Sequence, residues 1–206
     1  MRPTDALNEL RDLGLPAFET HEAAARLGLS TSRTSQILRT LADSGLAIQL
    51  RHGLWTLRED LDPFVLSPFL TAPFPSYVSF WSALARHGII EQLPRRVFVA
   101  SLGKPRRLTT SIGTYSIHHL APELFDGYKG SDDVGYLATP EKALFDSVYL
   151  RATRGGPILT AELELPRGFR ENKFKTWTNR VSPPRLKTLV SRGLAKALES
   201  ASRVDS

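Results

Sequence analysis

The sequence contains no cysteine among its 206 residues and no long apolar run. Without cysteine, disulfides, thiolate metal ligands and a cysteine nucleophile are all excluded. No segment approaches the ~20 apolar residues that a membrane-spanning helix needs, and the opening MRPTDALNEL has no apolar core of signal-peptide length. We therefore expect a soluble, cytoplasmic protein that makes no membrane contact.

Motifs for catalysis and cofactor binding are also missing. The chain has no P-loop, no G-x-G-x-x-G and no G-x-S-x-G elbow. His118 and His119 are adjacent on an expected strand, so their side chains point to opposite faces and cannot hold one metal ion together. Glu141 and Asp146 are five residues apart on an expected helix and do not share a face, which disfavours a nuclease-type metal site. We expect no enzymatic activity, no catalytic residue, no metal and no cofactor.

The net charge of +6 favours an anionic partner, but the charge is distributed unevenly. Residues 1–60 hold seven Lys or Arg against eight Asp or Glu, whereas residues 61–206 hold twenty against thirteen. The first sixty residues therefore cannot bind a partner through bulk positive charge.

Residues 1–60 show three helical patterns followed by two short β-prone runs. The helices are expected in TDALNELRDLG, in THEAAARLGL and in STSRTSQILRTLADSGLA, the last one capped by Ser30 and ended by Gly45. AIQLRHGLWTL reads as a hairpin that turns at His52 and Gly53. This order is typical of a winged helix-turn-helix, so we predict that residues 1–60 form a DNA-binding domain of that type.

The third expected helix has an outward face of residue types that bind DNA. Glutamine can pair with adenine and arginine with guanine, while serine and threonine reach phosphates or bases. A polar face is also ordinary for a surface helix, and it is the accompanying helix order and hairpin that favour DNA. The expected contacts on this helix are Thr31, Ser32, Arg33, Ser35, Gln36, Arg39 and Thr40, and those at the wing are Arg51 and His52.

Residues 61–75 form an expected proline-rich connector, with prolines at 63, 68, 73 and 75. Proline at this density is expected to block regular helix and central strand, which places a domain boundary here. The Phe and Leu content of the segment predicts that it packs along both halves of the chain.

Residues 76–206 are expected to form a mixed α/β domain with C-terminal helices, which makes the whole chain α+β. SYVSFWSALARHG, TPEKALFDSVYLRA and SPPRLKTLVSRGLAKALESA show helical periodicity. RRVFVAS alternates as a strand, and TYSIHHL and DVGYLAT are expected to be further strands of one sheet.

Basic residues recur in this second half. Residues 151–206 hold twelve Lys or Arg against five acids. They could contact flanking DNA phosphates or an acidic protein partner, and the sequence leaves both interpretations open. The same two interpretations apply to an earlier group around one strand and its turn, which consists of Arg95, Arg96, Lys104, Arg106 and Arg107.

The expected helix-turn-helix is followed by YVSFWSALARHGIIEQLPRRVFVAS, IGTYSIHHL and LATPEKALFDSVYL, in that order. Over roughly residues 5–155 this arrangement resembles the AbiEi-type antitoxin and viral-defence regulator family. The resemblance implies a cytoplasmic antitoxin that represses its own operon through the winged helix. It also implies a second domain, the antitoxin domain, that counteracts a nucleotidyltransferase-type toxin, in some relatives without a stable complex.

One recognition helix covers only a few base pairs, so we expect two copies of the chain on an inverted repeat in its own promoter. These copies would be a weak homodimer or monomers that meet on double-stranded DNA. The alternative is a ligand-responsive winged-helix regulator without a toxin partner. Its second domain would contain a concave apolar pocket with a few convergent polar groups.

Overall fold

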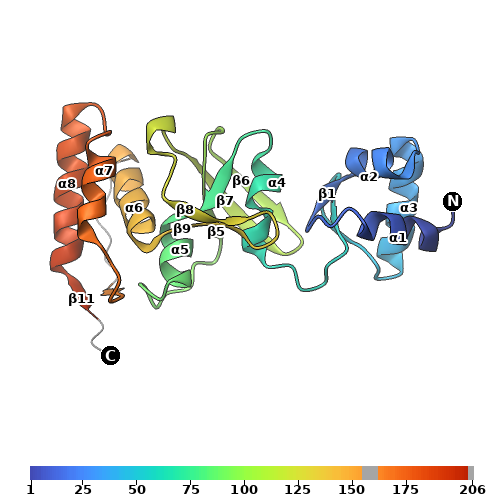
Figure 1. Cartoon of the computed structure of the whole chain (residues 1–206), viewed down its shortest axis with the longest axis horizontal. Coiled ribbons are helices and arrows are strands. Elements are labelled where there is room, and N and C mark those ends of the chain that lie inside the picture. Colours follow the sequence, from blue (N-terminus) through green and yellow to red (C-terminus); the bar gives the residue numbers. More distant parts are fainter. Residues whose placement is uncertain (155–161, 204–206) are drawn as a thin grey trace.

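The structure is a computed structural model, and it describes residues 1–154 and 162–203. The fold is mixed α/β. Figure 1 shows an elongated molecule with the N-terminal helices at one end, the larger sheet in the middle and the C-terminal helices at the other end.

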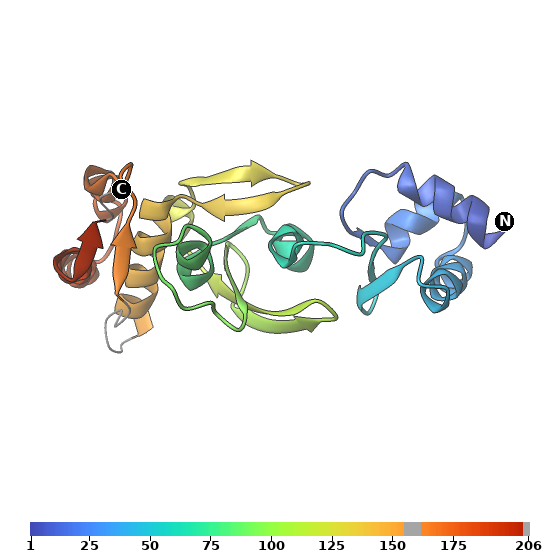
Figure 2. The same ribbon diagram turned by 90° about the horizontal axis from the view of Figure 1, so that it is seen from below.

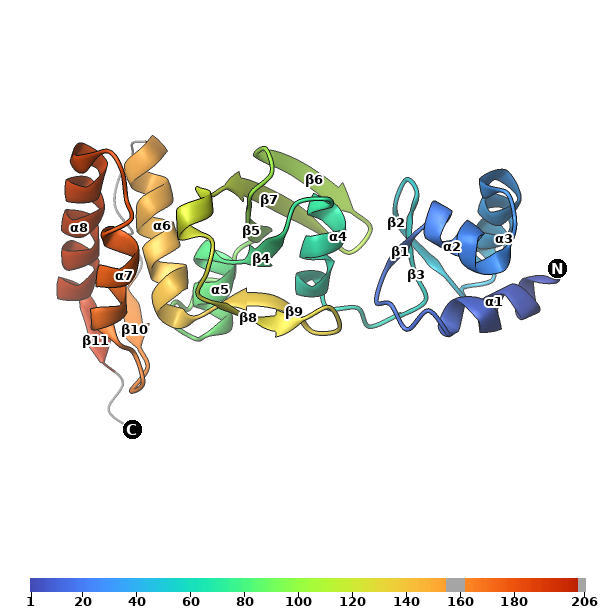
Figure 3. The same ribbon diagram turned by 45° about the horizontal axis from the view of Figure 1, so that its top comes forward.

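The N-terminal part combines three helices with a small sheet. Its elements are α1 (Pro3–Arg11), β1 (Phe18–Glu19), α2 (Thr20–Leu27), α3 (Thr31–Asp43), β2 (Ile48–Arg51) and β3 (Leu54–Thr56). The three helical patterns and the hairpin are thus found where the sequence predicts them. Figure 3 shows the small sheet, of strand order β1-β3-β2, between these helices and the rest of the chain.

Local chemistry fixes the ends of α3. The side chain of Ser30 accepts a hydrogen bond from the backbone N–H of Arg33 at 3.3 Å, which satisfies a donor of the first turn. Gly45 follows the last turn with φ +72°, a left-handed conformation in which a residue with a Cβ is strained. The buried face of the helix packs on α1 and α2 through Ile37, Leu38 and Leu41.

The proline-rich segment contains two short helices, so the prediction that it excludes regular helix is wrong. They are η1, a 3-10 helix (Pro63–Leu66), and α4 (Ser67–Thr71). Pro63 and Pro68 lie in their first turns, where a helix does not use the missing N–H.

The same segment packs against both halves of the chain. Its apolar side chains share one buried cluster with Ala17, Leu50 and Leu54 from the N-terminal part and with Val99 and Tyr115 from the larger sheet. The contact with both halves that the Phe and Leu content predicts is therefore present.

The larger sheet is mixed and has the strand order β6-β7-β5-β4-β9-β8. Its strands are β4 (Ser76–Val78), β5 (Val97–Ser101), β6 (Arg106–Thr110), β7 (Gly113–His119), β8 (Tyr128–Ser131) and β9 (Gly135–Ala138). The expected helix in SYVSFWSALARHG is correct only from Phe80 onward, as α5 (Phe80–Arg86). The residues before it form β4, because neighbours β5 and β9 pair with it on both sides.

Helices cover one face of this sheet and form the C-terminal end. They are η2 (Pro122–Leu124), α6 (Pro140–Arg154), η3 (Glu171–Lys173), α7 (Phe174–Thr178) and α8 (Pro184–Glu199), with the parallel pair β10 (Leu163–Leu165) and β11 (Ala201–Arg203) beside them. Their shared core includes Tyr77, Leu144, Phe145, Trp177 and Leu194. Within the described residues, no helix is both long and apolar enough to cross a membrane.

Two polar contacts connect the N-terminal part to the larger sheet. The backbone N–H of Ser111, in the β6–β7 turn, donates to the carbonyl of Leu50 in β2 at 2.9 Å. Arg58 forms an ion pair with Asp133 in the β8–β9 turn at 3.3 Å. Both hairpin turns of the sheet therefore contact the part of the chain that carries α3.

Candidate nucleic-acid interface

The outward face of α3 is the most complete candidate for binding a nucleic acid. Of its seven expected contact residues, six are exposed and Ser35 is half-buried. Helical spacing places Ser32, Gln36 and Arg39 on one line opposite the buried residues. Asp43 lies on the same line one turn later, and its negative charge disfavours a DNA contact at the C-terminal end of the helix, beyond Arg39.

Two of these side chains are already bonded to each other. An Arg33 guanidinium N–H donates to the side-chain oxygen of Gln36 at 3.2 Å, which orders both groups on the helix surface. The Thr40 hydroxyl donates to the backbone carbonyl of Gln36 at 3.0 Å and would have to give up that bond to donate to a phosphate. Arg39 makes no side-chain hydrogen bond or ion pair with the described residues.

The hairpin provides less positive charge than the sequence predicts. Arg51 is half-buried and lies 3.7 Å from the carboxylate of Glu19. Its Nε is buried and has no hydrogen-bond partner among the described residues. His52 is exposed at the turn, and Gly53 accepts bonds from the backbone N–H and the hydroxyl of Thr20, which tie the turn to α2.

The five basic residues expected around one strand do not form a single surface. Arg95 and Arg96 precede β5 and Lys104 follows it, so a strand of roughly 13 Å separates the two groups. Arg106 and Arg107 are neighbours on the edge strand β6 and point to opposite faces of the sheet. Both are exposed, and Arg106 donates to the carbonyl of Leu70 at the end of α4.

The basic residues of α8 lie far from α3. Figures 1 and 2, which view the molecule at right angles, both place α8 at the end opposite α1–α3. Arg185, Arg192 and Lys196 are exposed on that helix. This positive charge is therefore separate from the outward face of α3.

A buried charged cluster, which was not predicted from the sequence, lies at the centre of the second part. Lys142 and Asp146 are fully buried and form an ion pair one helical turn apart on α6. The hydroxyls of Tyr77 and Ser79 donate to the Asp146 carboxylate at 3.0 and 2.7 Å. The i, i+4 spacing within TPEKALFD is its only sequence signal, and the same spacing is common on solvated helices.

Burial shifts the pKa values of this cluster. Loss of hydration raises the pKa of Asp146 and lowers that of Lys142, while their mutual attraction opposes both shifts. No solvent-accessible substrate position adjoins either group, since both side chains are fully buried. The cluster therefore joins α6 to β4 as a structural element.

His118 and His119 lie on β7, and the first is buried while the second is exposed. Burial, together with the charges of Arg154, Arg107 and Arg96, lowers the pKa of His118 to about 4. Its ring stacks on Phe98, and one ring nitrogen lies 3.0 Å from the Ser116 hydroxyl. Among the described residues, no three His, Asp or Glu side chains come together as metal ligands.

A comparison with protein-family models gives no match for this chain, and a comparison with curated proteins gives none either.

Proposed function

We propose that the chain is a DNA-binding autorepressor and antitoxin whose N-terminal part is a winged helix-turn-helix. The observation that carries the DNA-binding half is the exposed line of Ser32, Gln36 and Arg39 on α3, a helix held outward by two helices behind it. The element order α1-β1-α2-α3-β2-β3, with β3 in the middle of the small sheet, supports the same assignment.

In this proposal α3 enters the major groove by the part of its outward face that runs from Thr31 to Arg39. Arg39 and Gln36 read base edges, while Arg33, Ser32 and Thr31 contact the backbone or bases. Ser35 and Thr40 contribute less, because the first is half-buried and the second is bonded to its own helix. His52 and Arg51 approach a neighbouring phosphate from the hairpin.

The antitoxin half rests on the resemblance to AbiEi-type regulators. The toxin would be a nucleotidyltransferase-type protein, counteracted by residues 76–206 in the cytoplasm, and the chain itself would catalyse no reaction. The distance between α3 and α8 supports a division of labour, because it leaves the basic C-terminal face free while α3 holds DNA.

The test separates the two activities by substitutions in the full chain and not by truncation. Leu50 and Leu54 share a core with the second part, and removing either part would expose that core. Arg33→Ala with Arg39→Ala should abolish repression of a reporter driven by the chain's own promoter. The same variant should still protect cells from the toxin encoded beside it. Arg192→Gln with Lys196→Gln serves as the matched control for repression.

Retention of repression by the α3 variant would overturn the DNA-binding proposal. Loss of protection in a variant that is expressed and folded like the wild type would overturn the division of labour.

A further inference from the structure

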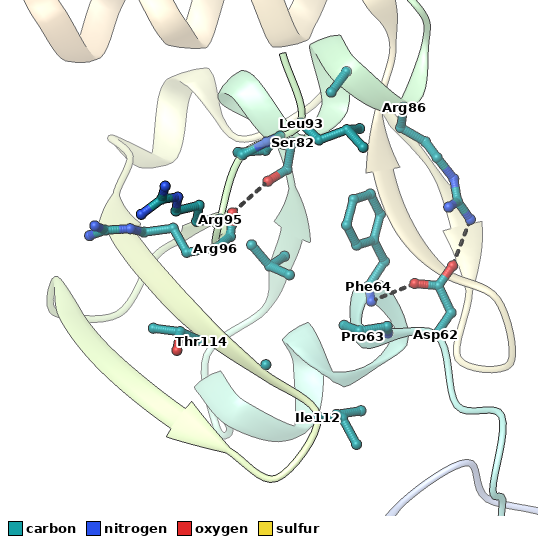
Figure 4. Close-up of a pocket in the computed structure, with 14 residues that line it drawn as sticks. Asp62, Pro63, Phe64, Ser82, Arg86, Leu93, Arg95, Arg96, Ile112 and Thr114 are labelled. Carbon is teal, nitrogen blue, oxygen red and sulfur yellow. Dashed lines mark hydrogen bonds and ion pairs between the residues drawn. The ribbon is translucent and has the colours of Figure 1, made fainter. Parts of the chain in front are cut away.

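A cavity of about 520 Å³ lies between the connector, α5 and the first residues of β5 and β7. This volume is within the range of small-molecule sites. Its apolar wall includes Phe64, Leu93, Val97 and Ile112. Figure 4 shows the Phe64 ring on one side and Arg95 and Arg96 on the other, with both arginine side chains extending away from the ring.

The cavity is lined by more positively than negatively charged side chains. Arg86 forms an ion pair with Asp62 at 2.6 Å and lies over the Phe64 ring at 5.1 Å, so its charge is compensated. Arg95 and Arg96 have no side-chain hydrogen bond or ion pair with the described residues. Two neighbouring guanidinium groups that form no ion pair with an acidic side chain favour the binding of an anionic group.

The apolar surface of the cavity favours a ligand with a flat ring. Phe64 offers a ring face at the wall, and Leu93 at the mouth is 83% exposed, an unusual degree for a leucine. An apolar ring that covers both would remove them from water, while an anionic group at the far end of the ligand reaches the two arginines at the outer edge of the cavity.

The cavity walls are the same segments that hold the N-terminal part. Ile112 and Gly113 line the cavity next to Ser111, whose N–H bonds to Leu50 of β2. Pro63 lines it from the connector and accepts a bond from the Tyr115 hydroxyl of β7 at 2.8 Å. A ligand that displaces either wall would therefore move a support of the hairpin beside α3.

From these contacts we propose that the cavity binds a small organic anion with a flat apolar ring and couples its occupancy to α3. The coupling rests on the proposed DNA-binding function, whereas the binding site does not. The class includes aromatic carboxylates and ring-bearing phosphates, which share the same anion and ring chemistry.

The test uses 1-anilinonaphthalene-8-sulfonate, whose fused ring and sulfonate match this class and whose fluorescence reports binding to the full chain. We expect saturable binding at one site per chain. Arg95→Gln with Arg96→Gln should weaken it at least tenfold through loss of charge, and Ala85→Leu should do the same by filling the cavity. The controls Arg192→Gln with Lys196→Gln, and Ala195→Leu, should leave the affinity within twofold.

No saturable binding, or equal affinity in the wild type and the arginine variant, would overturn the site. Arg95 is exposed and Arg96 is half-buried, and neither side chain has a hydrogen bond or ion pair with the described residues, so the arginine variant tests the site even if Ala85→Leu fails to fold. If cavity and α3 are coupled, a saturating concentration of the probe should change the DNA affinity of the wild type at least threefold and leave that of the arginine variant unchanged. Saturating DNA should change the affinity for the probe by the same factor. An unchanged DNA affinity would overturn the coupling. Failure to bind any DNA, with probe binding intact, would instead contradict the proposed function.

Discussion

At the residue scale, the side chains expected to read DNA differ in what they are free to do. Arg39 and Ser32 lie on the outward line of α3, while Thr40 donates within the helix and Arg51 lies against Glu19. The types and positions of these residues could be predicted from the sequence. Their bonds could not, because a partner such as Glu19 comes close only when β1 and β2 join one sheet.

Arg39→Ala should reduce discrimination between operator and non-operator DNA by about 1–3 kcal/mol, if Arg39 contacts a guanine edge. Fluorescence anisotropy with operator and scrambled duplexes measures this difference. Arg11→Ala, which removes an exposed arginine from α1, is the matched control. Equal discrimination by the Arg39 variant and the wild type would remove Arg39 from the base edges.

His118 should make the protein less stable in mild acid. Its pKa is about 4 when folded and near 6.5 in an unfolded chain, so the unfolded state binds more protons between these values. The stability it contributes is complete above about pH 6.5 and is lost as the pH falls toward 4. Urea unfolding at about pH 7 and about pH 4.5 should show a smaller loss in His118→Gln than in the wild type. The same loss in both proteins would contradict a buried neutral imidazole.

At the element scale, the predictions that were wrong concern β4 and α4, whose structure depends on tertiary contacts and not on a local sequence pattern. Regular amphipathic patterns located α1, α2, α3, α6 and α8, because each repeats its apolar face over several turns. β4 is only three residues long and runs directly into α5, so no local pattern separates them. The short helix α4 forms despite its prolines because its side chains are buried between the two halves of the chain.

The α6 ion pair should behave as a buried pair. Asp146→Ala leaves the Lys142 ammonium and two hydroxyls without their acceptor, so unfolding free energy should fall by roughly 3–5 kcal/mol. Replacing both partners, by Lys142→Met with Asp146→Leu, should cost less than the single change. Urea denaturation of the three proteins measures this. A single variant as stable as the wild type would contradict a buried, charged pair.

At the scale of the whole molecule, the chain separates a mildly acidic end that carries α3 from a basic end that carries α8. Counting charges along the sequence could predict the asymmetry but not the distance, which follows from the sheet lying between them (Figure 1). In the proposed function, DNA and the toxin would therefore bind at different ends of the molecule. The connector and the two hairpin turns are the structural links between those ends.

Site-specific photocrosslinking shows whether α3 contacts DNA. A benzophenone amino acid replaces Gln36 in one protein and Lys196 in another, and each is irradiated with the duplex that precedes the chain's own gene. We predict a DNA crosslink from position 36 that competes with unlabelled operator, and none from position 196. A crosslink confined to position 196, or none from position 36 in a protein that still shifts the duplex, would contradict DNA binding by α3.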